Sequence, residues 1–172
     1  MNILLTGKPR IGKTTIIKKV VKDLKDVGGF YTEEIRDGYR KGFRIITLDG
    51  REGVLAHMGI KSRYRVGKYG VNIEDLENIA VKSVEESLDK DIIVIDEIGK
   101  MEIFSEKFRN TLEKALDTGK VLGTIMKKSN YFADKVKSRK DVEIIPVEES
   151  NRDMLIEEIK ETLNQKNLKH RT

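Results

Sequence analysis

The sequence predicts an α/β fold with three layers, in which a central, mainly parallel sheet carries an added antiparallel β-meander. The first supporting observation is an apolar segment, residues 1–6, that leads through a glycine-rich loop into apolar residues at helical spacing. The second is another apolar segment, residues 91–97, that ends in two acids. The third is a series of close turns between these segments, which favours antiparallel hairpins.

A phosphate-binding loop is predicted directly after the first strand. Its residues are Gly7, Lys8, Pro9, Arg10, Ile11, Gly12, Lys13 and Thr14, which match the pattern G-x-x-x-x-G-K-[ST]. In this pattern backbone N–H groups surround phosphate oxygens at the amino end of a helix, Lys13 reaches the β- and γ-phosphates, and the Thr14 hydroxyl reaches Mg²⁺. Thr15 continues the helix. We therefore predict a P-loop NTPase fold with nucleotide contacts at residues 7–15 and Mg²⁺ as the cofactor.

The segment 91–97 has the form of a Walker B strand, because a β-branched apolar run leads directly into Asp96 and Glu97. Open α/β sheets bind ligands at the carboxyl ends of their strands, so we expect Asp96 to face the Mg²⁺ held by Thr14. An acid immediately after the metal-facing aspartate can orient water for in-line attack on the γ-phosphate. We assign that catalytic task to Glu97.

Between these two motifs the sequence predicts the β-meander. The first helix is expected to stop at Gly28 and Gly29. Short strands are predicted at 30–36, 43–48 and 54–57. Glycine-containing turns at 37–38, 41–42 and 49–50 separate them, as expected for hairpins.

The segment 61–70 carries several positive side chains, two tyrosines and two glycines without helical or strand periodicity. We interpret it as a mobile loop. It could fold over the triphosphate, with Arg65 as a catalytic arginine finger and Lys68 beside it, or it could be a solvated connection. The sequence leaves both interpretations open.

The remaining elements follow from caps and apolar spacing. Asn72 can cap a helix that continues to Leu88, and Ser105 can cap another that stops at Gly119. Strands are predicted at 121–125 and 142–147, and a final helix opens at 151–153. On the first of these strands Thr124 could sense the γ-phosphate, although a strand threonine is usually structural. Arg152, at the start of the final helix, either contacts a nucleotide base or is a surface charge.

Composition fits one P-loop NTPase domain over residues 1–164, followed by a polar, basic tail, residues 165–172, that we expect to be frayed. Nothing resembles a signal peptide or a membrane span, so we expect a cytoplasmic protein without membrane contacts. The absence of cysteine excludes disulfides and thiolate catalysis, and two histidines make a zinc site improbable.

Charged residues make up 37% of the chain, with a single glutamine, a balance typical of proteins adapted to heat. The net charge is +5, but it is spread over a lysine-rich surface that carries nearly as many acids. No nucleic-acid-binding motif accompanies it, so nucleoside triphosphates are the expected partners, nucleic acid is a lesser alternative, and a monomer is favoured.

Taken together these motifs resemble the THEP1-type nucleoside-triphosphatase family over nearly the whole chain. The resemblance rests on residues 7–14, 29–36, 65–71, 93–102 and 151–153. It implies a P-loop fold and hydrolysis of ATP, GTP, CTP and UTP to diphosphates and phosphate, with broad base tolerance. It also implies nucleotide contacts at residues 7–14 and at Ile93, Val94, Ile95, Asp96, Glu97, Ile98, Gly99 and Lys100. One departure is Arg10, because loops of the family commonly carry glycine there.

Three functions are compatible with the sequence. The first is a Mg²⁺-dependent nucleoside-triphosphatase. The second is a nucleotide or nucleoside kinase in which Glu97 activates an acceptor hydroxyl instead of water. The third is an RNA-associated nucleotide-binding module, suggested by a sequence pI of about 9.2 and the basic tail. Phosphate release with and without acceptors separates the first two, and RNA binding tests the third.

Overall fold

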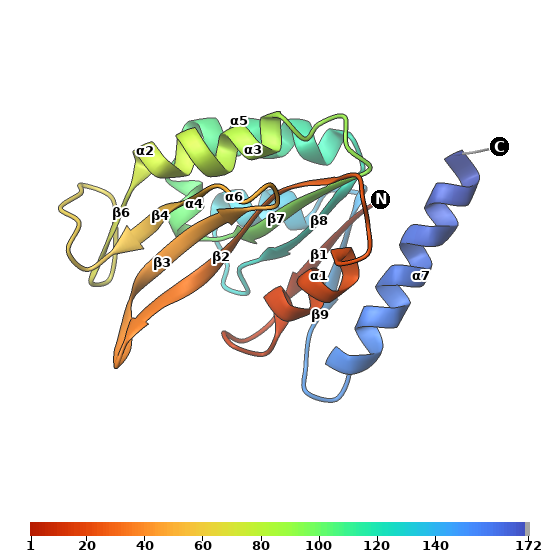
Figure 1. Cartoon of the computed structure of the whole chain (residues 1–172), viewed down its shortest axis with the longest axis horizontal. Helices are drawn as coiled ribbons and strands as arrows, with labels where there is room; N and C mark the ends of the chain where they lie inside the picture. The colour runs from red at the N-terminus through yellow and green to blue at the C-terminus, as the bar shows by residue number, and fades with distance from the viewer. Residues whose placement is uncertain (171–172) are drawn as a thin grey trace.

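The computed structural model describes residues 1–170, which form one mixed sheet with helices on both faces (Figure 1). The strand order is β5-β6-β4-β3-β2-β7-β8-β1-β9. The strands are β1 (Asn2–Thr6), β2 (Val27–Asp37), β3 (Tyr39–Thr47), β4 (Glu52–His57), β5 (Arg65–Val66), β6 (Tyr69–Val71), β7 (Ile92–Ile98), β8 (Val121–Ile125) and β9 (Val142–Pro146).

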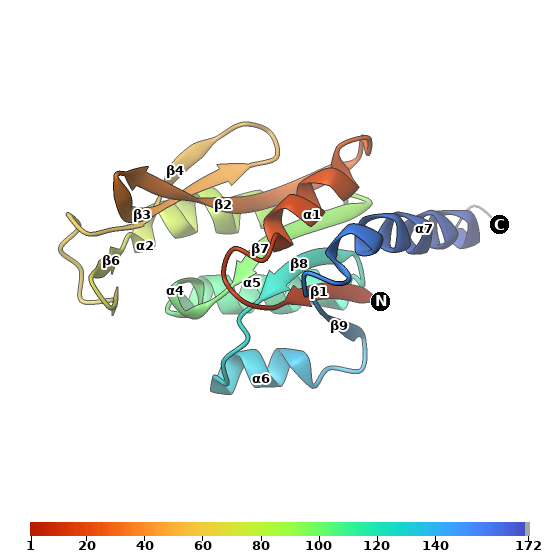
Figure 2. The same cartoon turned by 90° about the horizontal axis from the view of Figure 1, so that it is seen from below.

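Helices form the two outer layers, with α1 and α7 on one face of the sheet and α3 and α5 on the other (Figures 1 and 2). The helices are α1 (Lys13–Val21), α2 (Ile73–Asp75), the π-helical η1 (Leu76–Val81), α3 (Lys82–Glu85), α4 (Lys100–Ile103), α5 (Glu106–Asp117), α6 (Tyr131–Lys137) and α7 (Arg152–His170). Each face buries its own apolar cluster. The predicted three-layer α/β fold is confirmed.

The parallel part of the sheet consists of β2, β7, β8, β1 and β9, each of which runs parallel to its neighbour. The apolar run of β7 is buried on both sides, as expected for a central strand covered by two helical layers. Because these strands are parallel, the carboxyl ends of β1, β7 and β8 lie together at one end of the sheet. The phosphate loop and the Walker B acids therefore come together there.

The antiparallel meander is also confirmed, but the turn predicted at 41–42 is wrong, because these residues lie within β3. β2 pairs in parallel with β7 and antiparallel with β3, so it joins the two parts of the sheet. β3, β4 and β6 then follow in antiparallel order. In Figure 1 the β2–β3 hairpin extends towards the same end of the sheet at which the loop between β1 and α1 lies.

The segment 61–70 differs from the aperiodic loop that we predicted. Arg65 pairs with Gly70 and Val66 with Tyr69, so β5 and β6 form a small hairpin. Gly67 lies at its turn with φ +57, a conformation that favours glycine. β6 continues the sheet by pairing with β4, which ties this hairpin to the meander.

The predicted end of the first helix at Gly28 and Gly29 is wrong. Helix α1 ends at Val21, and both glycines lie within β2. A Cβ atom on Gly29 would lie 2.0 Å from the carbonyl oxygen of Val94 on β7. These glycines therefore allow close approach between neighbouring elements and do not stop a helix.

The predicted helix caps are confirmed. The Asn72 side chain accepts a hydrogen bond of 3.0 Å from the backbone N–H of Asp75, and α2, η1 and α3 then follow without a break. The Ser105 hydroxyl likewise accepts a 3.0 Å bond from the N–H of Phe108 at the start of α5. Helices α4 and α6 were not predicted, because elements this short show no clear apolar period.

Helix α7 continues through residues 165–170, which we expected to be frayed. No glycine or proline interrupts the sequence from residue 153 to residue 170, and Lys166 Nζ donates a hydrogen bond to the Met1 carbonyl oxygen. The rest of the predicted tail, residues 171–172, lies outside the described residues. Within the described part of the chain, no helix has the length and apolar character needed to cross a membrane.

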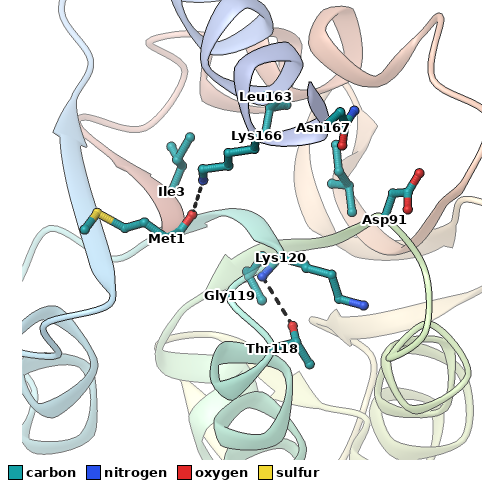
Figure 3. A pocket seen from close by; sticks show the side chains of 11 residues that line it. Met1, Ile3, Asp91, Thr118, Gly119, Lys120, Leu163, Lys166 and Asn167 are labelled. Carbon is teal, nitrogen blue, oxygen red and sulfur yellow. Dashed lines mark hydrogen bonds between the residues drawn. The ribbon is translucent and has the colours of Figure 1, made fainter. Parts of the chain in front are cut away.

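A cavity of about 670 Å³ lies at the end of the sheet where the parallel strands begin, opposite the phosphate loop (Figure 3). Leu163, Lys166 and Asn167 of α7 lie across it from Met1 and Lys120. The amino ends of the parallel strands lie here, whereas open α/β sheets bind their ligands at the carboxyl ends of their strands. We therefore assign the nucleotide site to the carboxyl ends.

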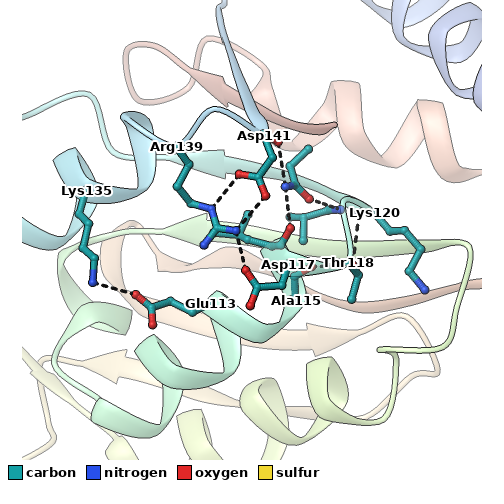
Figure 4. Close-up of polar contacts among 11 residues, drawn as sticks. Glu113, Ala115, Asp117, Thr118, Lys120, Lys135, Arg139 and Asp141 are labelled. Atoms are coloured by element: carbon teal, nitrogen blue, oxygen red, sulfur yellow. Dashed lines mark hydrogen bonds and ion pairs between the residues drawn. The ribbon is translucent and has the colours of Figure 1, made fainter.

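A polar network joins several elements near the amino ends of the parallel strands. Arg139 contacts Asp141 and Asp117 at 2.8 and 2.7 Å (Figure 4). The buried Asn2 amide donates to the Leu116 carbonyl oxygen at 2.9 Å and accepts from the N–H of Val121 at 2.9 Å. The network therefore fixes the start of β1 against α5, β8 and the start of β9.

Candidate active site

The phosphate loop has the backbone conformation that its glycines predict. Gly7 and Gly12 have φ values of +155 and +112. A Cβ atom on Gly7 would lie 2.8 Å from the Val147 carbonyl oxygen, so the loop could not approach the end of β9 with a larger residue there. The loop therefore curves tightly between β1 and α1.

Arg10 has φ +65, and among the described residues it is the one non-glycine residue with positive φ. This is the left-handed region, in which glycine is favoured and other residues are strained by about 1 kcal/mol or more. The departure noted in the sequence thus coincides with a real backbone demand for glycine. The exposed Arg10 side chain extends from the loop to within 3.6 Å of the Glu34 carboxylate on β2.

The amino end of α1 is free to bind an anion. Among the described residues, no side chain caps the helix, and no acid occupies its first turn. Its N–H groups and the helix dipole therefore favour a negative ligand. Lys13 Nζ donates to the carbonyl oxygens of Gly7 and Lys8 at 2.7 and 3.2 Å, which holds the ammonium group inside the loop.

Asp96 lies at the centre of the site, buried at the end of β7. Its Oδ2 accepts a hydrogen bond of 2.6 Å from Thr14 Oγ1, and its Oδ1 accepts one of 2.6 Å from Thr124 Oγ1. Burial raises the pKa of Asp96, while these two hydroxyl donors oppose the shift. We expected Asp96 to face the Mg²⁺ held by Thr14, and the two side chains lie in direct hydrogen-bonding contact. Thr124, which we interpreted as mainly structural, is the second partner of this carboxylate.

Glu97 follows Asp96 and is only partly exposed. Burial and the Asp96 charge raise the pKa of Glu97, and Lys13 opposes them. Glu102 of α4 lies close by and is buried; its Oε2 accepts a hydrogen bond of 3.1 Å from the Gly99 N–H. Glu102 was not predicted as part of the site. Its spacing, three residues after the N-cap residue Gly99 as in a capping box, could have indicated it.

Several residues that the resemblance implied as nucleotide contacts are core residues. The fully buried ones are Ile93, Val94, Ile95 and Ile98. They pack beneath the helices on both faces of the sheet and hold Asp96 in position. Gly99 is buried at the end of β7, and Lys100 is exposed at the start of α4. We therefore leave the four apolar residues out of the proposed contact set.

Arg152 lies beside the phosphate loop, because its Nη1 donates to the Ile11 carbonyl oxygen at 3.3 Å. An adjoining cavity of about 350 Å³ lies between the loop and the β9–α7 connection. Its lining residues are Thr6, Gly7, Lys8, Ile11, Lys127, Pro146, Val147, Glu148 and Glu149. Within residues 1–170, the buried Thr6 Oγ1 has no hydrogen-bond partner.

The structure does not bring Arg65 to the phosphate loop. Its guanidinium donates to the carbonyl oxygens of Ile60 and Lys68, at 3.2 and 2.9 Å, and so closes its own hairpin. We therefore do not carry the predicted arginine finger into the proposed mechanism. Lys68, by contrast, lines a cavity together with Pro9 and Arg10 of the phosphate loop.

The curved loop, the uncapped helix and the paired Thr14 and Asp96 side chains define a P-loop nucleotide-binding protein. The comparisons with known proteins agree with this class. Residues 2–160 match the model of a protein family described as NTPase. The nucleoside-triphosphatase THEP1 of Thermotoga sp. (strain RQ2) is 56% identical over 162 residues, which cover 92% of this chain and 93% of that protein.

Two solved structures are also similar. The crystal structure of THEP1 from the hyperthermophile Aquifex aeolicus has a TM-score of 0.86 and 36% identity, and the match covers 92% of this chain and 96% of the other. The solution structure of a human cancer-related nucleoside triphosphatase has a TM-score of 0.77 and 37% identity, and the match covers 92% of this chain and 94% of the other. The chain therefore belongs to the NTPase family that contains the THEP1 nucleoside-triphosphatases.

Proposed function

We propose that this chain is a Mg²⁺-dependent nucleoside-triphosphatase that hydrolyses ATP, GTP, CTP and UTP to the diphosphate and phosphate. One observation carries the proposal. Glu97 directly follows Asp96, whose carboxylate accepts a 2.6 Å hydrogen bond from Thr14 at the end of the phosphate loop. A carboxyl that can face a metal and one that can orient water thus lie together. The names of the similar proteins support the same reaction class.

Mg²⁺ fits this site because the available donors are oxygens. Thr14 Oγ1 donates its hydrogen to Asp96, which leaves the lone pairs of the hydroxyl oxygen for a cation. We propose that Thr14 would hold Mg²⁺ directly and that Asp96 would hold it through water. When bound, the ion would neutralise charge on the β- and γ-phosphate oxygens. Thr124 keeps the other oxygen of Asp96 engaged, so the carboxylate has a fixed orientation.

The residues of this chain would perform the rest of the reaction by positioning and charge. The N–H groups of the loop and of α1 would hold the phosphate oxygens. Lys13 would give up its hydrogen bonds to the loop carbonyl oxygens and donate to the phosphate oxygens instead. Glu97 would orient the attacking water and accept its proton. Its raised pKa suits this task, since a base whose pKa approaches the working pH transfers protons efficiently.

Broad base tolerance is proposed from the cavity beside the β9–α7 connection. Among the described lining residues, the long side chains are Lys8, Lys127, Glu148 and Glu149, all of them exposed on the surface. Flexible surface side chains discriminate bases less than a buried pocket with fixed polar groups does. We propose that the base lies there, with Arg152 alongside.

Phosphate release from ATP, GTP, CTP and UTP tests the proposed function, with Mg²⁺ and after its removal by a chelator. We expect turnover of all four, with kcat/KM values within about tenfold of each other and loss of activity without the metal. Hydrolysis of a single nucleotide would contradict the base tolerance. Undiminished hydrolysis with the chelator would contradict the role of Mg²⁺.

Phosphotransfer is the second candidate, because an open cavity lined by cations adjoins the phosphate loop. Phosphate release that falls when an acceptor is added, with the phosphoryl group recovered on the acceptor, would favour it over hydrolysis. Adaptation to heat, a monomeric state and a cytoplasmic location stay predictions from the sequence, as does the lesser alternative of an RNA-associated module.

A further inference from the structure

The cavity that Lys68 lines together with Pro9 and Arg10 lies between the phosphate loop and the meander, and its volume is about 740 Å³. Its lining residues are Pro9, Arg10, Arg36, Arg40, Phe43, Val66, Gly67, Lys68, Tyr69 and Met101. They come from the phosphate loop, the β2–β3 hairpin, the β5–β6 hairpin and α4. The triphosphate site proposed above does not use this space, which is the right size for a small molecule.

The cavity has an excess of positive charge. Arg10, Arg36 and Arg40 all surround one carboxylate, Glu34, at 3.6, 3.1 and 3.4 Å. Lys68 adds a further cation, and no acidic residue occurs among the described lining residues. One carboxylate cannot neutralise this group of cations, so an anionic ligand would lower its electrostatic energy.

Aromatic rings lie within the same cavity. Phe43 and Tyr69 pack edge to face with their centroids 5.5 Å apart. The Arg40 guanidinium lies over both rings, at 5.0 and 5.5 Å, and its Nε donates to the Tyr69 hydroxyl at 3.0 Å. Arg40 is therefore held in place before any ligand binds. Rings beside an ordered guanidinium are suited to a flat aromatic group that carries a phosphate.

We propose that this cavity is a second binding site, for a phosphate carried on an aromatic nucleoside, such as a nucleoside monophosphate. The phosphate would contact Arg36 and Lys68, and the base would pack against Phe43, Val66 and the other apolar lining. The proposal rests on the proposed function only in assigning the phosphate loop to the triphosphate. Binding at this site does not require hydrolysis.

The competing explanation is that these cations serve the triphosphate itself. Arg10 belongs to the phosphate loop and also lines the cavity, so its charge alone does not separate the two explanations. Arg36 and Lys68 are the more informative residues. They lie on the meander side of the cavity, and both side chains are exposed, so their removal should leave the fold intact.

Calorimetric titration tests the proposal directly. The phosphate loop is first filled with a non-hydrolysable triphosphate analogue and Mg²⁺, and AMP or CMP is then added. We expect one monophosphate to bind per chain with a Kd on the order of 0.1 mM, while the analogue stays bound. Adenosine and inorganic phosphate, each of which carries half of the recognised chemistry, should bind at least about tenfold more weakly.

Two variants and a matched control locate the site. Arg36→Ala and Lys68→Ala should each weaken monophosphate binding about tenfold, and much more than they weaken binding of the analogue. Arg44→Ala removes an exposed arginine from β3 that does not line the cavity, and it should change neither affinity. Melting temperatures of all three variants check that the fold is retained.

Four results would overturn the proposal. The first is the absence of saturable monophosphate binding, and the second is displacement of the analogue by the monophosphate. The third is a pair of variants that behave like Arg44→Ala. The fourth is tighter binding of a single-stranded oligonucleotide than of any monophosphate at this site. The proposed hydrolysis would stand in all four cases, since phosphate release from the triphosphates tests it separately.

Discussion

Asp96 receives a hydroxyl hydrogen bond on each of its carboxylate oxygens, from residues that are far apart in the sequence. Thr124→Val keeps the side-chain shape but removes the donor to Oδ1. A hydrogen bond to a charged group contributes about 1.5–3 kcal/mol, so we expect kcat to fall about tenfold or more. The Mg²⁺ concentration for half-maximal activity should rise as well, because the carboxylate loses its fixed orientation.

Thr124→Ser is the control for this change, since it retains the hydroxyl. Steady-state kinetics at a series of Mg²⁺ concentrations should show a near-normal kcat for Thr124→Ser. For Thr124→Val, kcat should be lower and the Mg²⁺ concentration for half-maximal activity should be higher. An equal defect in both variants would mean that Thr124 acts through packing and not through its hydrogen bond.

Glu102 is a buried acid whose charge is costly to the fold. Burial raises the pKa of its carboxyl well above the ordinary value of 4.5, and the neighbouring Glu97 raises it further. The folded state therefore binds the proton more tightly than the unfolded state does. Stability should fall as the pH rises from about 4.5 through the raised value.

Glu102→Gln should remove this pH dependence, because glutamine is neutral and can still accept the hydrogen bond from Gly99. We expect the variant to melt at a higher temperature than the wild type at neutral pH, with the difference shrinking towards pH 4.5. Thermal unfolding followed by circular dichroism measures this. A difference that is constant with pH would contradict the assignment of a raised pKa.

At the scale of residues, the sequence predicted those side chains that belong to motifs with a known mechanism. Thr14 and Asp96 are in contact because the loop and the Walker B strand each place a polar group at the same sheet edge. The role of Thr124 was not predictable, since it depends on β8 lying next to β7. Arg65 shows the converse case, because a basic composition does not reveal which way a guanidinium points.

Among the elements, β2 depends on glycine where it approaches β7. A Cβ atom on Gly29 would lie 2.0 Å from the Val94 carbonyl oxygen, and its φ of +104 is strained for any other residue. We expect Gly29→Ala to lower the free energy of unfolding by at least about 2 kcal/mol. Gly38→Ala, at an open turn with φ +76, should lose only about 1 kcal/mol. Urea unfolding compares the two, and equal losses would contradict the close-contact explanation.

The elements that could be predicted were those with strong local signals. Asn72 and Ser105 marked true helix starts, because their side chains satisfy N–H groups that the helix leaves free. The β5–β6 hairpin was missed, since its pairing is short and its stability comes from the contact with β4. Gly28 and Gly29 misled the interpretation, because a glycine pair resembles a helix stop unless the neighbouring strand is known.

Across the whole molecule, Asn2 connects the start of β1 to α5 and β8. Asn2→Ala would leave the buried N–H of Val121 without its acceptor and would remove the donor to Leu116. We expect a loss of about 2–4 kcal/mol in the free energy of unfolding. Asn110→Ala, an exposed change on α5, should be close to neutral. Similar melting temperatures for both variants would contradict the role of this network.

The overall architecture was predictable because two motifs fixed the orientation of the sheet and the turns between them required a meander. The strand order was not, since it depends on which strands lie beside β1, and nothing local in the sequence records that. The basic cavity was not predictable for the same reason. Arg10, Arg36 and Lys68 come from separate elements and meet only in the folded chain.

Hydrolysis by Glu97→Gln tests the proposed role of Glu97. We predict that phosphate release falls at least about 100-fold, while the Kd for the triphosphate stays within about threefold of the wild-type value. Glu52→Gln, an exposed change on the meander, is the matched control and should retain full activity. Wild-type turnover by Glu97→Gln would contradict the assignment of Glu97 as the residue that orients water.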